Sequence, residues 1–232
     1  MSLGLARPVI SAGAQGRGVR IALLDTGVNF QHPHVDRPQS QVAVIRAEDA
    51  LVVRQPDHEG DRVGHGTACA ALLLHLAPEV ELVSIRVTDA RPSTDAPRLA
   101  RAILAAAELG AEVIAVPLGT PRPSAELEEA VRVVCGQDRV LIAARPGPVV
   151  FPAALPGVLG VAHLDGVDVE YREGVWVAEG RARPIPGALG TNFYGPSLAV
   201  ARLAAALARY GQETGASASD ALPGFQKVLS VL

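Results

Sequence analysis

The sequence predicts a three-layer α/β fold, in which a mainly parallel sheet carries helices on both faces. Short apolar runs typical of buried strands alternate along the chain with longer Ala- and Leu-rich segments typical of helices. The strand-like runs are apolar at consecutive positions, as expected for a parallel sheet that is buried on both sides. Hydrophobic residues make up 49% of the chain and aromatic residues only 3%, so the core must be built from Ala, Val, Leu and Ile.

The expected elements follow one another in a regular order of strands and helices. Strands are expected at 19–27, 80–90, 112–120, 139–147 and 157–166. Helices are expected at 65–78, 95–111, 124–136 and 190–210. The stretch 163–187 is irregular and rich in Arg, Gly and Pro, which predicts hairpins or loops. The end of the chain, 217–232, predicts a short closing helix.

Single residues at the ends of these segments support the helix assignments. Pro78 closes the first helix, because proline cannot donate the backbone hydrogen bond that a helix interior needs. Pro97 in the first turn and Gly110 at the end of the second helix follow the usual asymmetry of helix termini. The hydroxyl of Ser124 is suited to cap the third helix.

Length and composition favour a single domain without nucleic-acid or membrane partners. Because no internal repeat or low-complexity linker divides the 232 residues, we expect one domain over 1–232, with an N-terminal extension at 1–17, a core at 18–210 and a C-terminal tail helix at 211–232. A net charge of −3 argues against nucleic acid. The sequence shows neither a secretory signal nor an apolar stretch of membrane-spanning length, so a cytoplasmic location is expected. Cys69 and Cys135 lie in apolar helical segments and are interpreted as buried thiols.

Three polar residues are expected at the carboxyl edge of the sheet. Asp25 ends the first strand, His65 opens the first long helix, and Asn192 opens the last helix. Catalytic groups of open α/β sheets gather at this edge, because strand carboxyl ends and helix amino ends meet there. Each residue alone also has a structural explanation, since Asp-Thr-Gly is a common turn at a strand end. The order of the three residues along the chain and the sequences around them are more informative about function than any one of the residues alone.

The segments around these residues resemble the Asp, His and Ser regions of the subtilisin-like serine proteases. They read IALLDTGVNFQHPHV, GHGTACAALL and GTNFYGPSLAVARLAAAL, and they occur in the family's order of Asp, His and nucleophile. The positions that agree with the family pattern are Asp25, Thr26, Gly27, His32, Pro33, His65, Gly66, Thr67, Gly190, Thr191 and Pro196. The intervening strands are also similar, so the resemblance covers residues 18–210. It implies a subtilisin-like fold with a peptide-binding cleft.

Two departures from the family pattern concern the catalytic groups. Asn192 stands where the resemblance places the nucleophilic Ser, and a carboxamide is not a nucleophile near neutral pH. An ungapped alignment places Gly147 where the family has the Asn of the oxyanion hole, so this donor is missing as well. We therefore expect Asp25, His65 and Asn192 to occupy the triad positions of a catalytically inactive protein.

The resemblance also locates the cleft that would hold an extended peptide. Besides Gly147, its expected peptide-binding residues are Pro117, Leu118 and Gly119 on one wall and Ser93, Thr94 and Asp95 on the other. Pro117 replaces a Ser of the family and cannot donate to a strand ladder, so pairing would depend on Leu118 and Gly119. The helix from His65 continues without the inserted loop that carries a tight calcium site in many secreted members. We therefore expect no calcium and no other cofactor.

These observations favour a pseudoprotease that binds an extended peptide or a partner protein through its cleft. The partner would be a precursor peptide, an active enzyme, or another protein with an extended segment. Arg145, Arg181 and Arg183 lie near the expected rim of the cleft and would suit an acidic partner. A solvated rim is the simpler explanation of these arginines.

Four other interpretations stay open at this stage. The chain is an active serine-type endopeptidase if Ser197 serves as nucleophile or if Asn192 was engineered in place of Ser, although helical spacing directs Ser197 away from His65. Asn192 is chemically able to cyclise onto its own backbone in a self-processing reaction. A scaffold subunit would use another surface. A metal site would require Asp57, His58, Glu59 and His65.

Overall fold

The computed structural model describes most of the chain, namely residues 10–11, 13–35, 44–46, 52–53, 60–88, 94–147, 149–184 and 193–230. Within these residues the chain forms a nine-stranded sheet in the order β3, β2, β4, β1, β5, β6, β7, β9, β8. The strands are β1 (Arg20–Asp25), β2 (Val44–Arg46), β3 (Val52–Val53), β4 (Glu81–Arg86), β5 (Val113–Val116), β6 (Val140–Ala144), β7 (Val158–His163), β8 (Val169–Arg172) and β9 (Val175–Ala178).

The sheet is parallel except at its two edges. The successive pairs from β2–β4 to β7–β9 are all parallel, whereas β3 and β8 pair antiparallel with β2 and β9. From β1 the chain passes to β4 on one side and then crosses to β5 on the other. Such a reversal leaves a crevice at the carboxyl ends of the strands, where α/β proteins bind ligands. Asp25, the last residue of β1, lies at this point.

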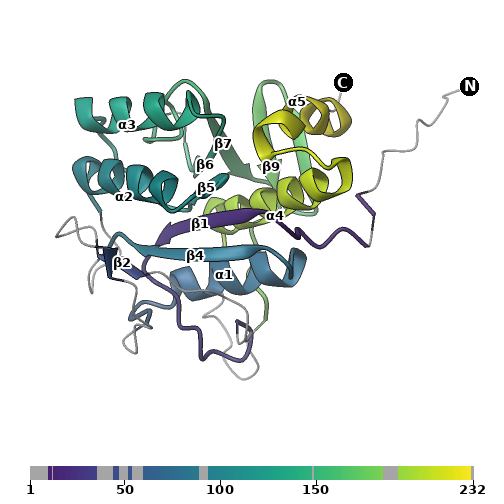
Figure 1. Ribbon diagram of the computed structural model, residues 1–232, viewed down its shortest axis with the longest axis horizontal. Coiled ribbons are helices and arrows are strands. Elements are labelled where there is room, and N and C mark those ends of the chain that lie inside the picture. Colours follow the sequence, from purple (N-terminus) through teal and green to yellow (C-terminus); the bar gives the residue numbers. More distant parts are fainter. Residues whose placement is uncertain are drawn as a thin grey trace, which may run out of the picture.

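Helices cover both faces of the sheet, which confirms the predicted three-layer fold. The described helices are α1 (His65–Leu76), α2 (Ala96–Glu108), α3 (Ala125–Cys135), α4 (Pro196–Thr214) and α5 (Ala218–Leu229). Side chains of α2 and α3 share one core with the strands, and those of α1, α4 and α5 share another. Figure 1 shows α2 and α3 on one side of β1 and β4, and α1 on the other. The sheet therefore separates two apolar cores.

Strand β1 explains why the central strands are apolar without interruption. Ile21 and Leu23 belong to the core of α1 and α4, whereas Ala22 and Leu24 belong to the core of α2 and α3. Successive side chains of a strand face opposite sides of the sheet, so a strand between two helix layers needs apolar residues throughout. Asp25 ends this run and is only 1% exposed. A carboxylate buried in this way requires hydrogen-bonding partners.

Short polar side chains cap α2 and α3, and only the cap at Ser124 was predicted. Asp95 accepts a hydrogen bond from the backbone N–H of Arg98 at 2.7 Å, and Pro97 lies in the first turn of α2. Ser124 accepts from the N–H of Leu127 at 3.2 Å at the start of α3. Both side chains satisfy helix N–H groups that have no partner within the helix.

Helix α4 begins later than the sequence predicted. Its expected start was Gly190, but Tyr194 is not helical and forms an antiparallel bridge with Arg181. Gly195 has a φ of 125°, which is incompatible with a right-handed helix, so α4 starts at Pro196. Asn192 itself lies outside the described residues, so the structure does not support the helical spacing assumed between positions 192 and 197.

Other boundaries differ from expectation for local reasons. β5 ends at Val116, four residues before the predicted end, because Pro117 cannot continue the ladder. α4 continues to Thr214 and ends at Gly215, which has a left-handed φ of 67°. The irregular stretch 163–187 contains the β8–β9 hairpin, as predicted. The tail forms α5, which packs on α4 through the Phe225 ring beside that of Tyr210.

The two cysteines differ from each other. Cys69 is fully buried, as predicted. Cys135, the last residue of α3, is only half-buried, and its Sγ lies 3.6 Å from the carbonyl of Gly157.

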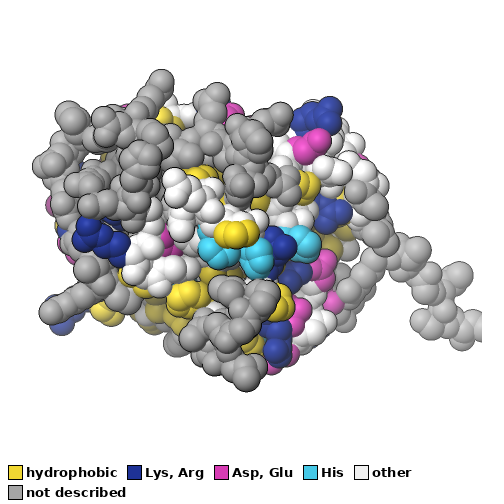
Figure 2. All heavy atoms as spheres, turned by 90° about the horizontal axis from the view of Figure 1, so that it is seen from below, with side chains coloured by type: hydrophobic (Ala, Val, Ile, Leu, Met, Phe, Trp, Pro, Cys, Tyr) yellow, Lys and Arg dark blue, Asp and Glu magenta, His cyan; other side chains and the backbone are white. Residues whose placement is uncertain are grey.

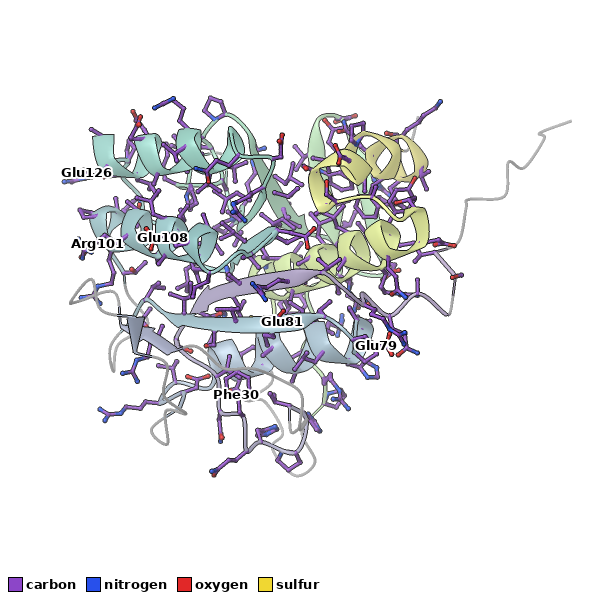
Figure 3. All side chains as sticks on the ribbon, viewed as in Figure 1. Phe30, Glu79, Glu81, Arg101, Glu108 and Glu126 are labelled. Atoms are coloured by element: carbon purple, nitrogen blue, oxygen red, sulfur yellow. The ribbon has the colours of Figure 1, made fainter. Side chains whose placement is uncertain are left out.

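On the outer sides of α2 and α3, Figure 3 shows the exposed residues Arg101, Glu108 and Glu126. No helix among the described residues has the length and apolarity needed to cross a bilayer.

Candidate active site

Asp25 and His65 form a hydrogen-bonded pair at the carboxyl edge of the sheet. His65 Nδ1 lies 2.8 Å from Asp25 Oδ1 and 2.9 Å from Asp25 Oδ2. Because a carboxylate only accepts, Nδ1 carries the proton in this contact. The side chain of Asp25 is 1% exposed and that of His65 is 15% exposed. The structure thus brings together two of the three predicted triad residues in an enclosed contact.

The pKa of His65 is raised above its ordinary value. Burial acts in the opposite direction, but the hydrogen bond with Asp25 and the negative charges of Asp25 and Asp61 outweigh it. The ring of Phe193 packs edge-on against the imidazole, with 5.2 Å between the ring centroids. A histidine oriented in this way is able to take a proton from a neighbouring nucleophile, provided that one is present.

Asp61 organises the loop before α1 and the first turn of that helix. Its Oδ1 accepts from the hydroxyl of Thr26 at 2.8 Å and from the N–H groups of Val63 and Gly64 at 3.0 and 2.7 Å. Its Oδ2 accepts from the N–H and the hydroxyl of Thr67, both at 2.8 Å. Gly64, at the N-cap position, has no side chain to cap α1, so Asp61 performs this task instead.

The start of α1 lies in backbone contact with the turn after β1. A Cβ atom at Gly66 would lie only 2.1 Å from the carbonyl oxygen of Gly27 and 3.1 Å from Asp25 Cβ. The N–H of Gly66 donates to the hydroxyl of Thr26 at 2.9 Å. This approach places the His65 ring beside Asp25, and it requires a residue without a side chain at position 66.

Cys69 lies one turn along α1 from His65 and is buried beside the pair. The potential metal-ligating atoms of Asp25, His65 and Cys69 lie within 4.8 Å of one another. Burial, and after it the charge of Asp25 and a hydrogen bond to it, raises the pKa of the Cys69 thiol well above its ordinary value. The thiol therefore stays protonated near neutral pH, and a protonated thiol is a poor metal ligand and a poor nucleophile.

The predicted peptide-binding wall follows β5. The carbonyl of Pro117 accepts a hydrogen bond from Ser197 Oγ at 2.7 Å. Leu118 is half-buried and Gly119 is exposed, and neither forms a ladder hydrogen bond with another described strand. No described strand therefore pairs with Leu118 or Gly119, whereas Ser197 is engaged with Pro117.

Beyond Gly119 the wall is closed by the segment after β6. Thr120 and Phe151 exchange two backbone hydrogen bonds, with N···O distances of 2.8 and 3.0 Å. A Cβ atom at Gly119 would lie 2.3 Å from Cγ1 of Val150. Any side chain at position 119 would therefore displace the Val150 side chain that supports this wall.

The other predicted cleft residues are only partly described. Ser93 and Asn192 lie outside the described residues, as do Asp57, His58 and Glu59 of the alternative metal site. Thr94 is half-buried at the start of α2, and the carboxylate of Asp95 is used as the helix cap. Gly147 lies just after β6, where a Cβ atom would meet nothing within 4 Å among the described residues. Position 147 therefore has room for a side chain.

The three arginines of the expected rim have different surroundings. Arg181 pairs with Asp165 at 2.7 Å and with Glu179 at 2.9 Å. Arg145 packs its side chain near Gly160, so that a Cβ atom there would lie 3.2 Å from Arg145 Cδ. Arg183 lines a pocket of about 540 Å³ beside α1. The three do not form one basic patch.

Fold and site together define an α/β protein with an enclosed Asp–His pair at the switch point of a parallel sheet. Residues 16–220 match the model of the subtilase family, and the chain belongs to this family. The resemblance inferred from the three sequence segments is thereby confirmed.

Individual relatives show the same relationship. Subtilisin Savinase of Lederbergia lenta is 30% identical over 166 residues, which are 66% of this chain and 58% of Savinase. An intracellular serine protease of Paenibacillus polymyxa is 28% identical over 238 residues, covering 90% of this chain and 72% of that protein. The crystal structure of a cold adapted subtilisin-like serine proteinase has a TM-score of 0.71 and 21% identity, covering 92% of this chain and 82% of that one. The match with Savinase spans less than two thirds of Savinase.

Three residues of the site were not singled out as site residues in the sequence. In the sequence, Asp61 lies in a polar loop, Cys69 is interpreted as a buried thiol, and Phe193 carries no signal of a site. An acidic residue within one turn before a helix start is a capping signal, so Asp61 was accessible to sequence reasoning. The contacts of Cys69 and Phe193 with the pair depend on how α1 and the segment before α4 pack, which no local pattern reveals.

Proposed function

We propose that this chain is a pseudoprotease of the subtilase family, which binds an extended peptide segment in its cleft without cleaving it. The proposal is carried by Asn192, which occupies the nucleophile position in a sequence that otherwise retains the Asp25–His65 pair. The amide nitrogen of Asn192 is conjugated with its carbonyl and has no lone pair available for attack. In subtilisin, loss of the Ser lowers turnover by a factor on the order of 10⁶.

Among the described residues, no hydroxyl or thiol forms a hydrogen bond with the imidazole of His65. The hydroxyls of Thr26 and Thr67 donate to Asp61, and that of Ser197 donates to Pro117. The thiol of Cys69 is fully buried and protonated. Each group already has a partner or lacks access to a substrate, so within the described residues none supports the interpretation as an active endopeptidase.

The absence of a side chain at Gly147 supports the same conclusion independently. The developing oxyanion of a tetrahedral intermediate needs preorganised donors, and removal of one such donor costs a factor of about 10² to 10³ in turnover. Gly147 supplies no side-chain donor at the position where the family alignment expects one. Two separate requirements of acyl transfer are therefore unmet.

Peptide binding is supported by the wall after β5. Leu118 and Gly119 present backbone groups without a ladder partner among the described strands. An extended peptide laid along them would add a strand and gain main-chain hydrogen bonds. Pro117 contributes no donor and its carbonyl is occupied by Ser197, so these two residues would have to supply the pairing.

Absence of hydrolysis is tested with the purified full chain. We expect no labelling by a fluorophosphonate probe and no cleavage of unstructured protein substrates, with the His65→Ala variant as the background. Labelling or turnover that disappears in His65→Ala would show that a working nucleophile exists.

Peptide binding is tested with a random dodecapeptide library displayed on phage. The best selected sequence, made with a fluorescein label, serves as probe in anisotropy titrations. Methylation of successive backbone nitrogens of this probe should weaken binding at every second residue, because alternate N–H groups point toward the same edge. If the library yields no binder, the cleft does not hold peptides and a scaffold role through another surface is favoured.

A further inference from the structure

A pocket of about 540 Å³ lies beside the Asp25–His65 pair, separated from the imidazole by the ring of Phe193. It is formed by the loop after β1, the first turns of α1 and residues 182–183. Figure 2, viewed from below relative to Figure 1, shows histidine and arginine side chains side by side on this face. The volume lies within the usual range of small-ligand sites.

We propose that this pocket receives a carboxylate on a short aliphatic stem, namely a glutamate or aspartate side chain of a peptide bound in the cleft. The inference rests on the proposed function and deepens it, because it specifies an acidic residue in the bound segment. Three observations carry it: the donors at one side of the pocket, the hydrogen bonds that occupy both oxygens of its acidic residue, and its apolar remaining walls.

The donors come from His32, His34 and Arg183. His32 Nδ1 accepts from the N–H of His34 at 3.2 Å, so the proton of the neutral His32 ring resides on Nε2, which is a donor. The two imidazole rings meet edge to face at 5.1 Å between centroids. Arg183 Nη1 donates to the carbonyl of His34 at 3.3 Å, which holds the guanidinium beside these rings. The arrangement concentrates N–H donors on one wall.

The electrostatic setting of His34 agrees with an anion site. Burial lowers the pKa of His34, and the positive charges of Arg183, His32 and His75 lower it further. A group whose neighbours disfavour its protonation lies in a region of positive potential. A carboxylate placed there would relieve the repulsion among these groups.

Asp61 is the acidic residue in the pocket lining, and its charge is directed elsewhere. Both of its oxygens accept hydrogen bonds, five in all, from Thr26, Val63, Gly64 and Thr67. It also lies at the N-terminus of α1, whose dipole offsets negative charge. Its two oxygens are therefore occupied, and no described hydrogen bond joins them to Arg183, although the negative charge of Asp61 remains in the pocket.

The remaining lining explains why the ligand should be a carboxylate on a stem and not a bare anion. Ala68 and Ala71 of α1, Ala182 and Phe193 present apolar surface to the pocket. Methylene groups gain free energy on such surface, whereas a phosphate ion would be desolvated without compensation. A glutamate side chain presents methylenes to the alanines and its carboxylate to Arg183.

The pocket is tested directly by NMR of the full-length protein. The probe is N-acetylglutamate N-methylamide, and the readout is the imidazole Cε1–H signals of His32 and His34, assigned with the His32→Gln and His34→Gln variants. We expect saturable shifts of these signals and at least a tenfold weaker apparent affinity in Arg183→Gln. N-acetylglutamine N-methylamide should give no saturable shift.

Control variants and competing anions decide the interpretation. Arg181→Gln removes an arginine on the same segment that pairs outside the pocket, and it should leave the titration unchanged. Equal shifts with inorganic phosphate would overturn the assignment to a carboxylate on a stem, and equal shifts with N-acetylglycine would show a site for a chain terminus instead. Absence of any saturable shift would overturn the proposal that the pocket binds a carboxylate.

The peptide experiment separates this inference from the proposed function. In the library selection we expect Glu or Asp to dominate at one position of the dodecapeptides. Replacement of that residue by Gln or Asn should weaken binding at least tenfold in the wild type and less than twofold in Arg183→Gln. Selected peptides that bind without this preference would overturn the proposal that the pocket receives an acidic side chain, and they would still support peptide binding in the cleft. A saturable NMR shift without any selected peptide binder would support the carboxylate pocket and overturn peptide binding in the cleft.

Discussion

The two halves of the candidate site differ in how firmly they are built. The half that carries Asp25 and His65 is enclosed: the Asp25 carboxylate accepts from His65 Nδ1 and from the N–H of Thr26, and the N–H of Gly66 donates to the hydroxyl of Thr26. The half that would attack a substrate contains Gly147, beside open space, and Asn192, which is known from the sequence alone. The first half is buried, and under the proposed function the second lacks two functional groups.

This difference shows why an intact Asp–His pair is weak support for catalysis. Asp25 is buried, so removing its partner would leave an uncompensated charge, which is strongly destabilising. The pair is therefore retained for stability even when no chemistry requires it. A nucleophile or an oxyanion donor faces the substrate, and its loss has little structural cost.

Rebuilding the weak half should produce the largest effect. In the Asn192→Ser variant we expect turnover of an unstructured protein substrate to stay close to the background. Adding Gly147→Asn should raise turnover by a factor of about 10² to 10³, because the oxyanion then gains a donor. Turnover is measured by gel and by fluorophosphonate labelling.

The control for this rebuilding is His65→Ala in the double variant, which should return turnover to background. If Asn192→Ser alone were strongly active and Gly147→Asn added nothing, the second half of the site would have lost one group and not two.

Glycine substitutions compare the packing of the two halves. Gly66→Ala should lower the free energy of unfolding by about 3 kcal/mol or more, because its Cβ would lie 2.1 Å from the Gly27 carbonyl oxygen. Gly147→Ala should change it by less than about 0.5 kcal/mol, since nothing lies within 4 Å of that Cβ. Urea denaturation measures both. Equal effects would mean that the halves do not differ in packing.

Removal of the Asp61 carboxylate tests how the first half is held. Asp61→Ala should cost about 2 to 3 kcal/mol of unfolding free energy, because several N–H and O–H donors at the start of α1 lose their acceptor. Asp95→Ala serves as the matched control, since it removes a single exposed cap and should cost about 1 kcal/mol. A loss of unfolding free energy no larger than that of Asp95→Ala would show that water satisfies the donors that Asp61 satisfies in the wild type.

The pH dependence of stability gives the smallest effect and concerns His65 alone. Its pKa is raised in the folded protein, so the folded state binds the proton more tightly than the unfolded chain does. The resulting stabilisation is complete below the ordinary pKa of about 6.5 and is lost as the pH rises through the raised value. The free energy of unfolding of the wild type relative to His65→Gln should therefore fall with rising pH between these two values. A difference independent of pH would contradict a raised pKa.

Much of the fold was accessible to sequence reasoning because its signals are local. The run of apolar residues from Ile21 to Leu24 predicts a strand buried on both faces, and both cores do receive its side chains. The cap at Ser124 was predicted from the short polar side chain before helical periodicity. The start of α4 was not, because the bridge between Tyr194 and Arg181 joins segments that are separated along the chain.

By itself the sequence determined the family, the order of the elements, the positions of Asp25 and His65 at one edge of the sheet, and the identity of Asn192. These properties reside in short motifs whose spacing does not depend on distant contacts. Only the tertiary structure decided that the thiol of Cys69 lies against the pair and that Arg183 meets His32 and His34 in one pocket. The last of these contacts joins residues about 150 positions apart, a separation whose closure depends on the packing of α1 and α4 against the same face of the sheet.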